Sequence, residues 1–317
     1  MAFVPYMFWL LARKCNRSKS TFVMSPIDNR PSQSRSPRKF SWGEIEMATK
    51  DFGMVAGEGG FSTVYRAVLA DQTVCAVKVV GRNFELLRRA YMQELHALLR
   101  ARHDNLVNLV GYCDDREAGI LVLEYVNNGN LHDTLHANDK FLAWPHRVGI
   151  ARQIASALQY LHEVCDPPIL HCDIKSANIL LDENYNAKLC DFGFSRTGDS
   201  SYLTKSSVLG SPGYIDPHCF KSGIVCKKTD VYSFGVLLLE LITGMKAFCG
   251  EKRKLLAVFS SPFLENPSRL SEIIDTRLSG CYDYKEVKSM ASIASLCIQG
   301  NPELRPSMNE VVKMMNA

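Results

Sequence analysis

The pattern of apolar residues changes near Gly129, and this change restricts the chain to a fold with two unlike parts. Over residues 52–126 the segments VYRAVLA and TVCAVKVV are rich in β-branched residues, and one helical stretch interrupts them around residues 85–101. After Gly129 apolar residues recur every three or four positions, and in DVYSFGVLLLELITG they surround the helix almost completely. We therefore predict an α+β fold. A small lobe (about 52–126), with an antiparallel β-sheet and one helix, precedes a larger, mainly α-helical lobe (about 127–317).

Charge is distributed unevenly along the chain. Of the formal net charge of +4, residues 1–39 carry +7, from eight Lys or Arg and one acid, so the remainder carries −3. A mildly acidic body argues against a nucleic-acid-binding domain. A basic leader is attracted to an anionic membrane surface, although a solvated tail has the same composition. The eleven cysteines form no C-x-x-C pair and no H-E-x-x-H is present, so neither a zinc site nor a disulfide framework is indicated, and a reducing cytosol fits.

The first residues have the pattern of a short anchor. Residues 2–12, AFVPYMFWLLA, are almost wholly apolar and are followed at once by basic residues. Eleven helical residues would span only about 17 Å, against roughly 30 Å for the hydrocarbon core of a bilayer. A secretory signal carries its charges before the apolar run, so this order is typical of the last turns of a membrane helix or of an interfacial anchor. Cys15 stands where S-palmitoylation would add a second anchoring signal, and a plain thiol is an equally good interpretation.

A linker follows the apolar run. Residues 25–39 are rich in Ser, Pro and Arg and contain almost nothing to bury. We expect residues 1–39 to form an anchor with a basic Ser/Pro-rich linker, and residues 40–317 to form the folded domain.

A glycine-rich turn between two predicted strands is the first chemical signal. It consists of Gly57, Glu58, Gly59, Gly60, Phe61, Ser62, Thr63 and Val64. Glycines let the backbone approach phosphate oxygens closely and direct N–H groups at them. The turn is not a P-loop, because no G-K-[ST] follows, and it is not a dinucleotide fingerprint, because a strand comes next. By itself, such a hairpin is more often only a turn.

A lysine one strand later strengthens the signal. Lys78 ends the apolar segment CAVK, twenty-one residues after Gly57. A lone lysine there would normally extend to water. Glu94 lies in the helical stretch, where it can face the sheet, pair with Lys78 and aim its ammonium at two phosphates. Glu85 is a rival partner, but it lies near the start of that helix.

Two segments of the second lobe supply oxygen ligands. HCDIKSAN contains Asp173 and Asn178, and LCDFG contains Asp191 thirteen residues later. Two carboxylates and an amide are suited to magnesium, with one carboxylate left to orient a hydroxyl. Any one of these segments alone is consistent with a surface loop, but their order is hard to explain by chance.

Taken together, these motifs resemble those of eukaryotic protein kinases, from about residue 52 to the C-terminus. Finer segments are similar to plant receptor-like and receptor-like cytoplasmic kinases of the Pelle type: FSWGEIEMATKDF, RHDNLVNLVGYC, LVLEYVNNGNL, GSPGYIDP, KTDVYSFGVLLLELITG and NPELRPSM. The resemblance implies a bilobed kinase fold and a serine/threonine protein kinase that uses ATP and Mg²⁺ to phosphorylate a protein substrate. It also implies an upstream receptor kinase as partner, and a location in the cytosol or, through residues 1–20, at the cytoplasmic face of the plasma membrane.

The resemblance implies a role for each phosphate-site residue. The glycine-rich turn from Gly57 to Val64 would cover the ATP phosphates, and Lys78, held by Glu94, would contact the α and β phosphates. Asn178 and Asp191 would ligate magnesium, while Asp173 would accept the proton of the incoming hydroxyl. Lys175, which can neutralise the γ-phosphate, is typical of serine/threonine kinases.

Further roles concern the adenine and the loop that carries Asp173. Glu124 and Val126 would offer backbone groups to the adenine edge, with Leu123 at the back of the pocket. The ring would lie between Val64, Ala76 and Leu180. Asp230 would anchor the loop from the buried helix, where an acid must be hydrogen-bonded.

Two departures from the family pattern concern the phosphate side of the site. Ser62 replaces the third glycine of the turn, which is a small change. Cys172 replaces the arginine before the catalytic aspartate, as in non-RD kinases. That arginine normally pairs with a phosphorylated activation segment, so we expect activity to depend weakly on phosphates at Thr204, Ser206 or Ser207.

A third departure lies farther along the chain. His218 stands where a glutamate normally follows Ile-Asp-Pro, and that glutamate usually pairs with an arginine, here Arg305. Because losing one partner of a buried pair is costly, either Arg305 has reached another acid or the larger lobe is looser than in relatives.

Two alternatives to an active protein kinase remain. A pseudokinase scaffold, binding nucleotide or partners without efficient turnover, draws support from Cys172 and His218. It is opposed by the joint presence of Lys78, Glu94, Asp173, Asn178 and Asp191. A small-molecule kinase is opposed by GSPGYIDP, which resembles a peptide-positioning segment and should bring Ser211 near Asp173.

Overall fold

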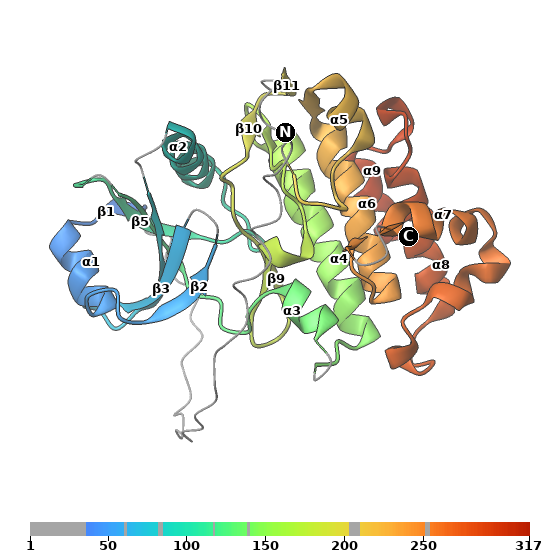
Figure 1. Ribbon diagram of the computed structural model, residues 1–317, viewed down its shortest axis with the longest axis horizontal. Coiled ribbons are helices and arrows are strands. Elements are labelled where there is room, and N and C mark those ends of the chain that lie inside the picture. Colours follow the sequence, from blue (N-terminus) through green and yellow to red (C-terminus); the bar gives the residue numbers. More distant parts are fainter. Residues whose placement is uncertain are drawn as a thin grey trace.

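The computed structural model describes residues 36–59, 62–81, 85–116, 118–137, 140–202, 210–250 and 254–317. Figure 1 shows a sheet-rich lobe, in blue and cyan, beside a helical lobe, in green to red. This arrangement confirms the predicted bilobed α+β fold. The predicted anchor with Cys15, and the linker up to residue 35, lie outside the described residues.

The small lobe is built on a six-stranded sheet with the order β1-β5-β6-β4-β3-β2. Its strands are β1 (Arg38–Lys39), β2 (Val55–Glu58), β3 (Ser62–Val68), β4 (Val74–Val80), β5 (Leu109–Cys113) and β6 (Gly119–Glu124). Neighbouring strands are antiparallel, as predicted, except that β1 runs parallel to β5. No hairpin joins β1 to β5, so the connection does not impose an antiparallel direction. The short strand covers the open edge of β5.

A second helix in this lobe, α1 (Trp42–Thr49), corrects the prediction of a single one. Ser41 and Glu44 form a capping box, in which each side chain accepts a hydrogen bond from the other's backbone N–H. Ile45 and the preceding Phe40 are fully buried in a cluster with Val77 of β4. The chain is therefore folded against the sheet well before residue 52.

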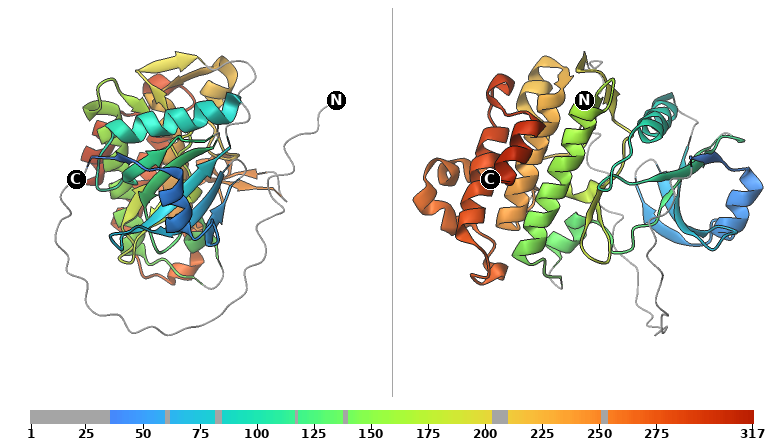
Figure 2. Two further views of the ribbon diagram at one scale, coloured as in Figure 1. Left: turned by 90° about the vertical axis from the view of Figure 1, so that its left-hand side faces the viewer. Right: turned by 180° about the vertical axis from the view of Figure 1, so that it is seen from behind.

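Helix α2 (Glu85–Arg100) matches the helical stretch predicted at residues 85–101. Side chains alternate along β4, so Val77 faces the α1 cluster whereas Val80 packs with Tyr91 and Leu95 of α2 in the main core. Lys78 lies on the same face of β4 as Val80. The sheet therefore directs Lys78 toward α2. The left view of Figure 2 shows α2, in turquoise, across the sheet.

The large lobe is mainly helical. Its helices are α3 (Leu131–His136), α4 (Trp144–Gln159), α5 (Pro217–Ser222), α6 (Lys227–Thr243), α7 (Leu256–Glu265), α8 (Tyr284–Cys297) and α9 (Met308–Met315). Its short strands are β7 (Ile169–Leu170), β8 (Ile179–Leu181), β9 (Ala187–Leu189), β10 (Arg196–Thr197), β11 (Ser200–Tyr202), β12 (Ile224–Cys226), β13 (Phe248–Cys249) and β14 (Lys254–Leu255). Short helical turns occupy Tyr160–Val164, Ser176–Asn178, Pro267–Ile273, Thr276–Leu278 and Pro302–Leu304.

Helix α6 forms the centre of this lobe, as its all-round apolar pattern predicts. Every residue from 229 to 243 is buried. Gly235 allows α8 to approach closely, because a Cβ atom at this position would lie 2.7 Å from the Cβ of Cys297 and 2.8 Å from Ile298. A rigid central helix is thus available to hold polar groups in place. Among the described helices, none is long and apolar enough to cross a membrane.

Candidate active site

Lys78 joins the two lobes through three hydrogen bonds. Its Nζ atom donates to Oε1 and Oε2 of Glu94 at 2.9 and 2.7 Å, and to Oδ1 of Asp191 at 2.8 Å. Glu94 comes from α2, whereas Asp191 follows β9 of the helical lobe. The structure thus contains the Lys78–Glu94 pair expected from the sequence. The rival Glu85 pairs instead with arginines of its own exposed turn.

Burial and charge fix the ionisation of this group. Glu94 is 2% exposed, and its burial raises the pKa of the carboxyl while Lys78 opposes this rise. Burial disfavours the charge on Lys78, but Glu94 and Asp191 outweigh it and raise the pKa of the ammonium. For Asp191, burial is again opposed by Lys78, which lowers the pKa to about 2. A positive Lys78 beside an ionised Asp191 is therefore the resting state at neutral pH.

A second polar group surrounds Asp173. Lys175 Nζ donates to Oδ2 of Asp173 at 2.7 Å, and Ser211 Oγ donates to its Oδ1 at 3.1 Å. The Asn178 amide nitrogen donates to Oδ2 at 3.0 Å and to the Asp173 carbonyl at 2.9 Å. Lys175 also donates to Ser211 Oγ at 2.9 Å. Ser211 thus lies beside Asp173, as GSPGYIDP led us to expect.

Asp230 of α6 fixes the loop that carries Asp173. Its carboxylate accepts the backbone N–H groups of His171 and Cys172, each at 2.8 Å, and lies 2.9 Å from Nε2 of His162. Burial opposes the charge on Asp230, but the hydrogen bond from His162 helps to lower its pKa. The buried acid is hydrogen-bonded, as its position required.

His171 connects this loop to the segment around Asp191. Its Nε2 atom lies 3.1 Å from the carbonyl oxygen of Cys190, and its ring lies 4.7 Å from that of Phe192. Burial lowers the pKa of His171, so the ring is neutral. Neutral Nε2–H can donate to Cys190 while Nδ1 accepts from the Asp173 N–H at 3.3 Å. His171 therefore fixes the loop that carries Asp173 relative to the segment that carries Asp191.

The glycine-rich turn links β2 and β3. Gly57 and Glu58 end β2 and lie opposite Val64 and Thr63 of β3, while the Gly59 N–H donates to the Ser62 carbonyl at 2.8 Å. Gly60 and Phe61 lie outside the described residues. The structure therefore provides the expected hairpin, with Val64 opposite Lys78 in the register of β3 and β4.

The predicted adenine-site residues come from four strands, β3, β4, β6 and β8, and from the segment after β6. Ala76 shares a face of β4 with Lys78, Leu180 lies on β8, and both are partly buried against the core. Glu124 ends β6, and its N–H donates to the Asn108 carbonyl at 2.9 Å. Val126 follows two residues later and is half-buried.

Comparison with known proteins identifies this arrangement. Residues 51–315 match the protein kinase domain family. The chain belongs to the protein kinase family. It is 47% identical over 291 residues to "Salt tolerance receptor-like cytoplasmic kinase 1" of Oryza sativa subsp. japonica, covering 88% of this chain and 80% of that protein. A receptor-like protein kinase of Arabidopsis thaliana is 39% identical over 292 residues, covering 86% of this chain and 85% of its own.

Relatives with the serine/threonine designation are longer. A leucine-rich-repeat receptor-like serine/threonine-protein kinase of Arabidopsis thaliana is 38% identical over 304 residues, which cover 94% of this chain but 35% of that protein. This kinase is accordingly a serine/threonine protein kinase of the plant receptor-like type. Protein kinases use ATP with a divalent metal and act on protein substrates.

The donor atoms of the kinase site fit a hard divalent cation. Asp191 offers carboxylate oxygens, and in the described part of the chain its Oδ1 is paired with an ammonium that phosphate oxygens can share. The amide nitrogen of Asn178 donates to Asp173, so the amide oxygen is the atom that can ligate a cation. Carboxylate and amide oxygens are the preferred ligands of such cations.

Arg305 of the kinase pairs with Asp216 and not with residue 218. Its guanidinium donates to both carboxylate oxygens of Asp216 at 2.7 Å, and neither side chain is exposed. Asp216 is also the N-cap of α5, accepting the His218 N–H at 2.9 Å. Of the two alternatives left open at residue 218, the first is therefore correct.

Cys172 fills an apolar pocket instead of facing solvent. It packs with Leu170, Cys219 and Val225, and burial raises the pKa of its thiol well above the usual value. Its φ angle of 67° lies in the left-handed region. Thr204, Ser206 and Ser207 lie outside the described residues, so their expected minor role stays a prediction.

Sequence reasoning missed three residues that hold the site together. Tyr214 accepts the Ser176 N–H at 3.1 Å and donates a short hydrogen bond to Glu240 of α6, while His162 supports Asp230. These contacts join segments 26 to 68 residues apart in the chain. The available signals were Glu240 and His162, polar residues inside otherwise apolar helical segments, whereas Tyr214 lies in a turn.

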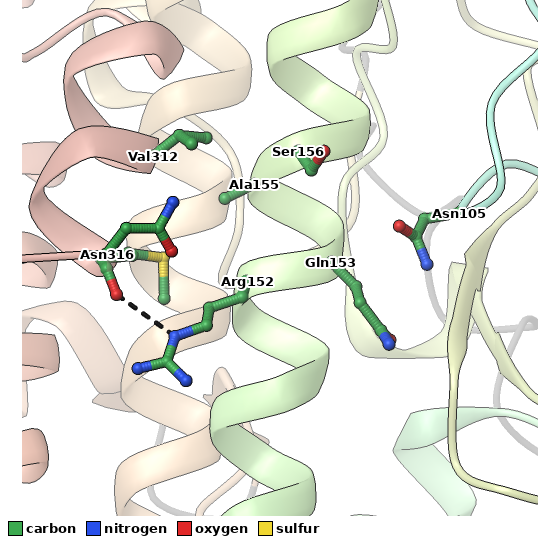
Figure 3. A pocket seen from close by; sticks show the side chains of 8 residues that line it. Asn105, Arg152, Gln153, Ala155, Ser156, Val312 and Asn316 are labelled. Carbon is green, nitrogen blue, oxygen red and sulfur yellow. Dashed lines mark hydrogen bonds between the residues drawn. The ribbon is translucent and has the colours of Figure 1, made fainter.

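A separate hollow of about 260 Å³ lies between α4 and α9 (Figure 3). Arg152 spans part of it and donates to the Met315 carbonyl at 3.2 Å, while Gln153 bonds to Asn186 and Ser156 to His103. Arg152, Gln153 and Ser156 of its lining are thus already partnered. No residue of the Lys78 or Asp173 groups lines this hollow.

Proposed function

We propose that this kinase transfers the γ-phosphoryl group of ATP to protein Ser or Thr hydroxyls at the site formed by the Lys78 and Asp173 groups. One observation carries the proposal. Lys78 contacts Glu94 and Asp191 at once, at 2.7 and 2.8 Å, so the three segments needed for phosphate binding are already assembled. Catalysis at such a site consists mainly of positioning and charge stabilisation.

The nucleotide side of the site comprises the hairpin and the strands beneath it. The backbone from Gly57 to Val64 would cover the phosphates, and Lys78 would bind the α and β phosphates. Ala76, Val64 and Leu180 would enclose the adenine, with the Glu124 carbonyl and the Val126 N–H at its edge. The shared face of Ala76 and Lys78 on β4 supports this orientation.

The hydroxyl side depends on Asp173. Its Oδ1 atom, which now accepts from Ser211, is suited to orient a substrate hydroxyl and accept its proton. Lys175, 2.7 Å from the same carboxylate, would neutralise charge on the transferred group. The Ser211 hydroxyl beside both groups supports a place for the substrate chain here.

We propose Mg²⁺ as the divalent ion, held by Asp191 and Asn178. When bound, it would neutralise charge on phosphate oxygens. Lys78 and Lys175 would supply the remaining positive charge from two directions.

The pseudokinase alternative has no support beyond the departures themselves. Cys172 packs in an apolar cluster, the Arg305 that residue 218 would pair with is bonded to Asp216, and all five functional groups named in the sequence analysis are present. We further propose a cytosolic kinase that receives signals from a receptor kinase. The relationship to receptor-like cytoplasmic and receptor-like kinases supports this proposal. Membrane attachment through residues 1–20 stays a prediction from the sequence.

The proposal is tested with Lys78→Met and the matched control Lys288→Met, which alters an exposed lysine on α8. Transfer of labelled phosphate from Mg-ATP to a generic basic protein should disappear in Lys78→Met and persist in Lys288→Met, with product on Ser or Thr. Equal transfer by both variants, or label on Tyr alone, would refute the proposal.

A further inference from the structure

A cluster of potential metal ligands lies outside the phosphate site. His132 and His136 of α3 and Glu240 of α6 bring three ligand atoms within 4.8 Å of one another. Glu240 is 1% exposed, the side chain of His136 is 5% exposed, and His132 is half-buried. The rings of the two histidines, at positions i and i+4 of the helix, lie 4.7 Å apart.

His136 has an acceptor opposite each of its ring nitrogens. Nδ1 lies 3.1 Å from the Gly244 carbonyl oxygen, and Nε2 lies 3.0 Å from Oε1 of Glu240. A carbonyl can only accept, so Nδ1 carries a proton. In a neutral ring Nε2 then directs its lone pair at a carboxylate. A cation between Nε2 and Oε1 removes this conflict.

The outer contacts of the cluster are those of a metal site. Histidines that bind metals generally donate their other ring N–H to a carbonyl, carboxylate or similar group, which orients the ring. His136 has the Gly244 carbonyl in this position, and His132 has Ser176 Oγ, 3.3 Å from its Nδ1. The second carboxylate oxygen of Glu240 accepts from Tyr214. Both histidines are therefore oriented through a ring nitrogen that the metal would not use, and Oε1 of Glu240, which faces His136, also accepts the Ala247 N–H at 3.2 Å.

We propose that His132, His136 and Glu240 bind a zinc ion, with a fourth position open to water. Two imidazoles and one carboxylate with an open position are a known zinc ligand set. Tetrahedral zinc with bonds near 2.0–2.2 Å places ligand atoms roughly 3.4 Å apart, and Nε2 of His136 already lies 3.0 Å from Glu240. A small rotation of half-buried His132 would complete the set.

No short sequence motif could reveal this site, because Glu240 lies 104 residues after His136. It also contacts the substrate side of the kinase, because Ser176 and Tyr214, which hold His132 and Glu240, bond to each other at 3.0 Å. Zinc would thereby stabilise the junction between the Asp173 loop and the segment that carries Ser211.

The test uses the full chain, stripped with a chelator and titrated with Co²⁺ as a spectroscopic probe and then with Zn²⁺. His132→Ala and His132→Gln remove one histidine ligand, and Gln can keep the polar contact to Ser176. His146→Ala, an exposed histidine of α4, is the matched control. Sites with cysteine ligands are distinguished by thiolate-to-cobalt charge-transfer bands in the near ultraviolet.

The proposal predicts one Co²⁺ equivalent without charge-transfer bands in the wild type and in His146→Ala, displaced by Zn²⁺ but not by Mg²⁺. Binding at this site should weaken at least about 100-fold in both His132 variants, beyond the 10–100-fold typical for loss of an outer contact. Zn²⁺ should raise the melting temperature of the wild type and not of these variants. Equal affinity in the wild type and the His132 variants, only thiolate-bound cobalt, or no binding at all would overturn the proposal and leave a proton between His136 and Glu240.

Discussion

Arg305 and Asp216 form a bidentate ion pair, with both N–O distances at 2.7 Å and both side chains fully buried. The pair links the start of α5 to the turn before α9. It takes the place of the pair with residue 218 that is usual in the family. The helical lobe therefore retains its buried arginine contact with a different acid.

Removing Asp216 should destabilise the kinase strongly. Asp216→Ala leaves Arg305 buried without a partner, which typically costs about 3–5 kcal/mol. Asp283→Ala is the matched control, because Asp283 caps α8 in the same way but has no described ion pair and is exposed. Loss of a cap alone costs about 1 kcal/mol. Chemical denaturation measures both values, and equal losses would show that the ion pair contributes nothing.

His218→Glu should leave the melting temperature unchanged or lower it. Arg305 already contacts both carboxylate oxygens of Asp216. A glutamate at position 218 would therefore add a negative charge that has no unpaired arginine to bind. A clear rise in melting temperature would show that the Asp216 pair does not replace the usual one.

Acidification should remove the stability contributed by Asp191. Burial opposes its charge, but Lys78 outweighs burial and lowers the pKa from the usual 3.8 to about 2. Between pH 3.8 and about pH 2, the carboxyl of Asp191 binds a proton more readily in the unfolded chain than in the folded one. The contribution is therefore complete above roughly pH 5 and is lost as the pH falls toward 2.

Unfolding free energies of the wild type and Asp191→Asn, measured over this pH range, test that prediction. The difference between them should be constant near neutral pH and should shrink below pH 4 or so. A difference independent of pH would contradict the assigned pairing with Lys78.

Restoring the arginine usual at residue 172 should destabilise the protein. Cys172 occupies an apolar pocket with Leu170 and Val225, and overpacking alone costs about 1–3 kcal/mol. Cys281→Arg, at an exposed cysteine, is the control and should change little. If Cys172→Arg is as stable as the control, the pocket must open toward the activation segment.

Phosphates on the activation segment should matter less than the Ser211 hydroxyl. Backbone pairing of β10 with β7 and of β11 with β12, and the Asp199–Lys227 ion pair at 3.3 Å, hold the segment where it is described. Alanine at Thr204, Ser206 or Ser207 should therefore preserve transfer. Ser211→Ala, which removes a contact of Asp173, should slow transfer about 10–100-fold. The reverse ranking in kinase assays would refute the non-RD interpretation.

The sequence predicted those parts of the fold and site that depend on local pattern. Lys78 and Glu94 were paired correctly because strand alternation and helix position both limit where a side chain can point. The buried α6 followed from its all-round apolar pattern. Helix α1 was missed although Ser41 and Glu44 form a recognisable capping box, because its eight residues bury only Ile45 and Thr49 and show no clear apolar period.

Long-range contacts of polar residues could not be deduced in this way. The choice of Asp216 as the partner of Arg305 depends on how the start of α5 meets a turn 89 residues later. The approach of His136 to Glu240 depends on the packing of α3 against α6. Nothing in the neighbouring sequence encodes either distance.

The most direct test of the kinase site compares Asp173→Asn with the wild type and with Asp104→Asn, an exposed aspartate before β5. Phosphate transfer from Mg-ATP and equilibrium ATP binding are measured on the same preparations. We predict that Asp173→Asn lowers transfer by about 10²–10⁴-fold, as expected for loss of a general base, while ATP affinity and the Asp104→Asn rate stay unchanged. Transfer by Asp173→Asn at the wild-type rate, or a folded wild type that binds ATP without transferring phosphate, would contradict the assignment.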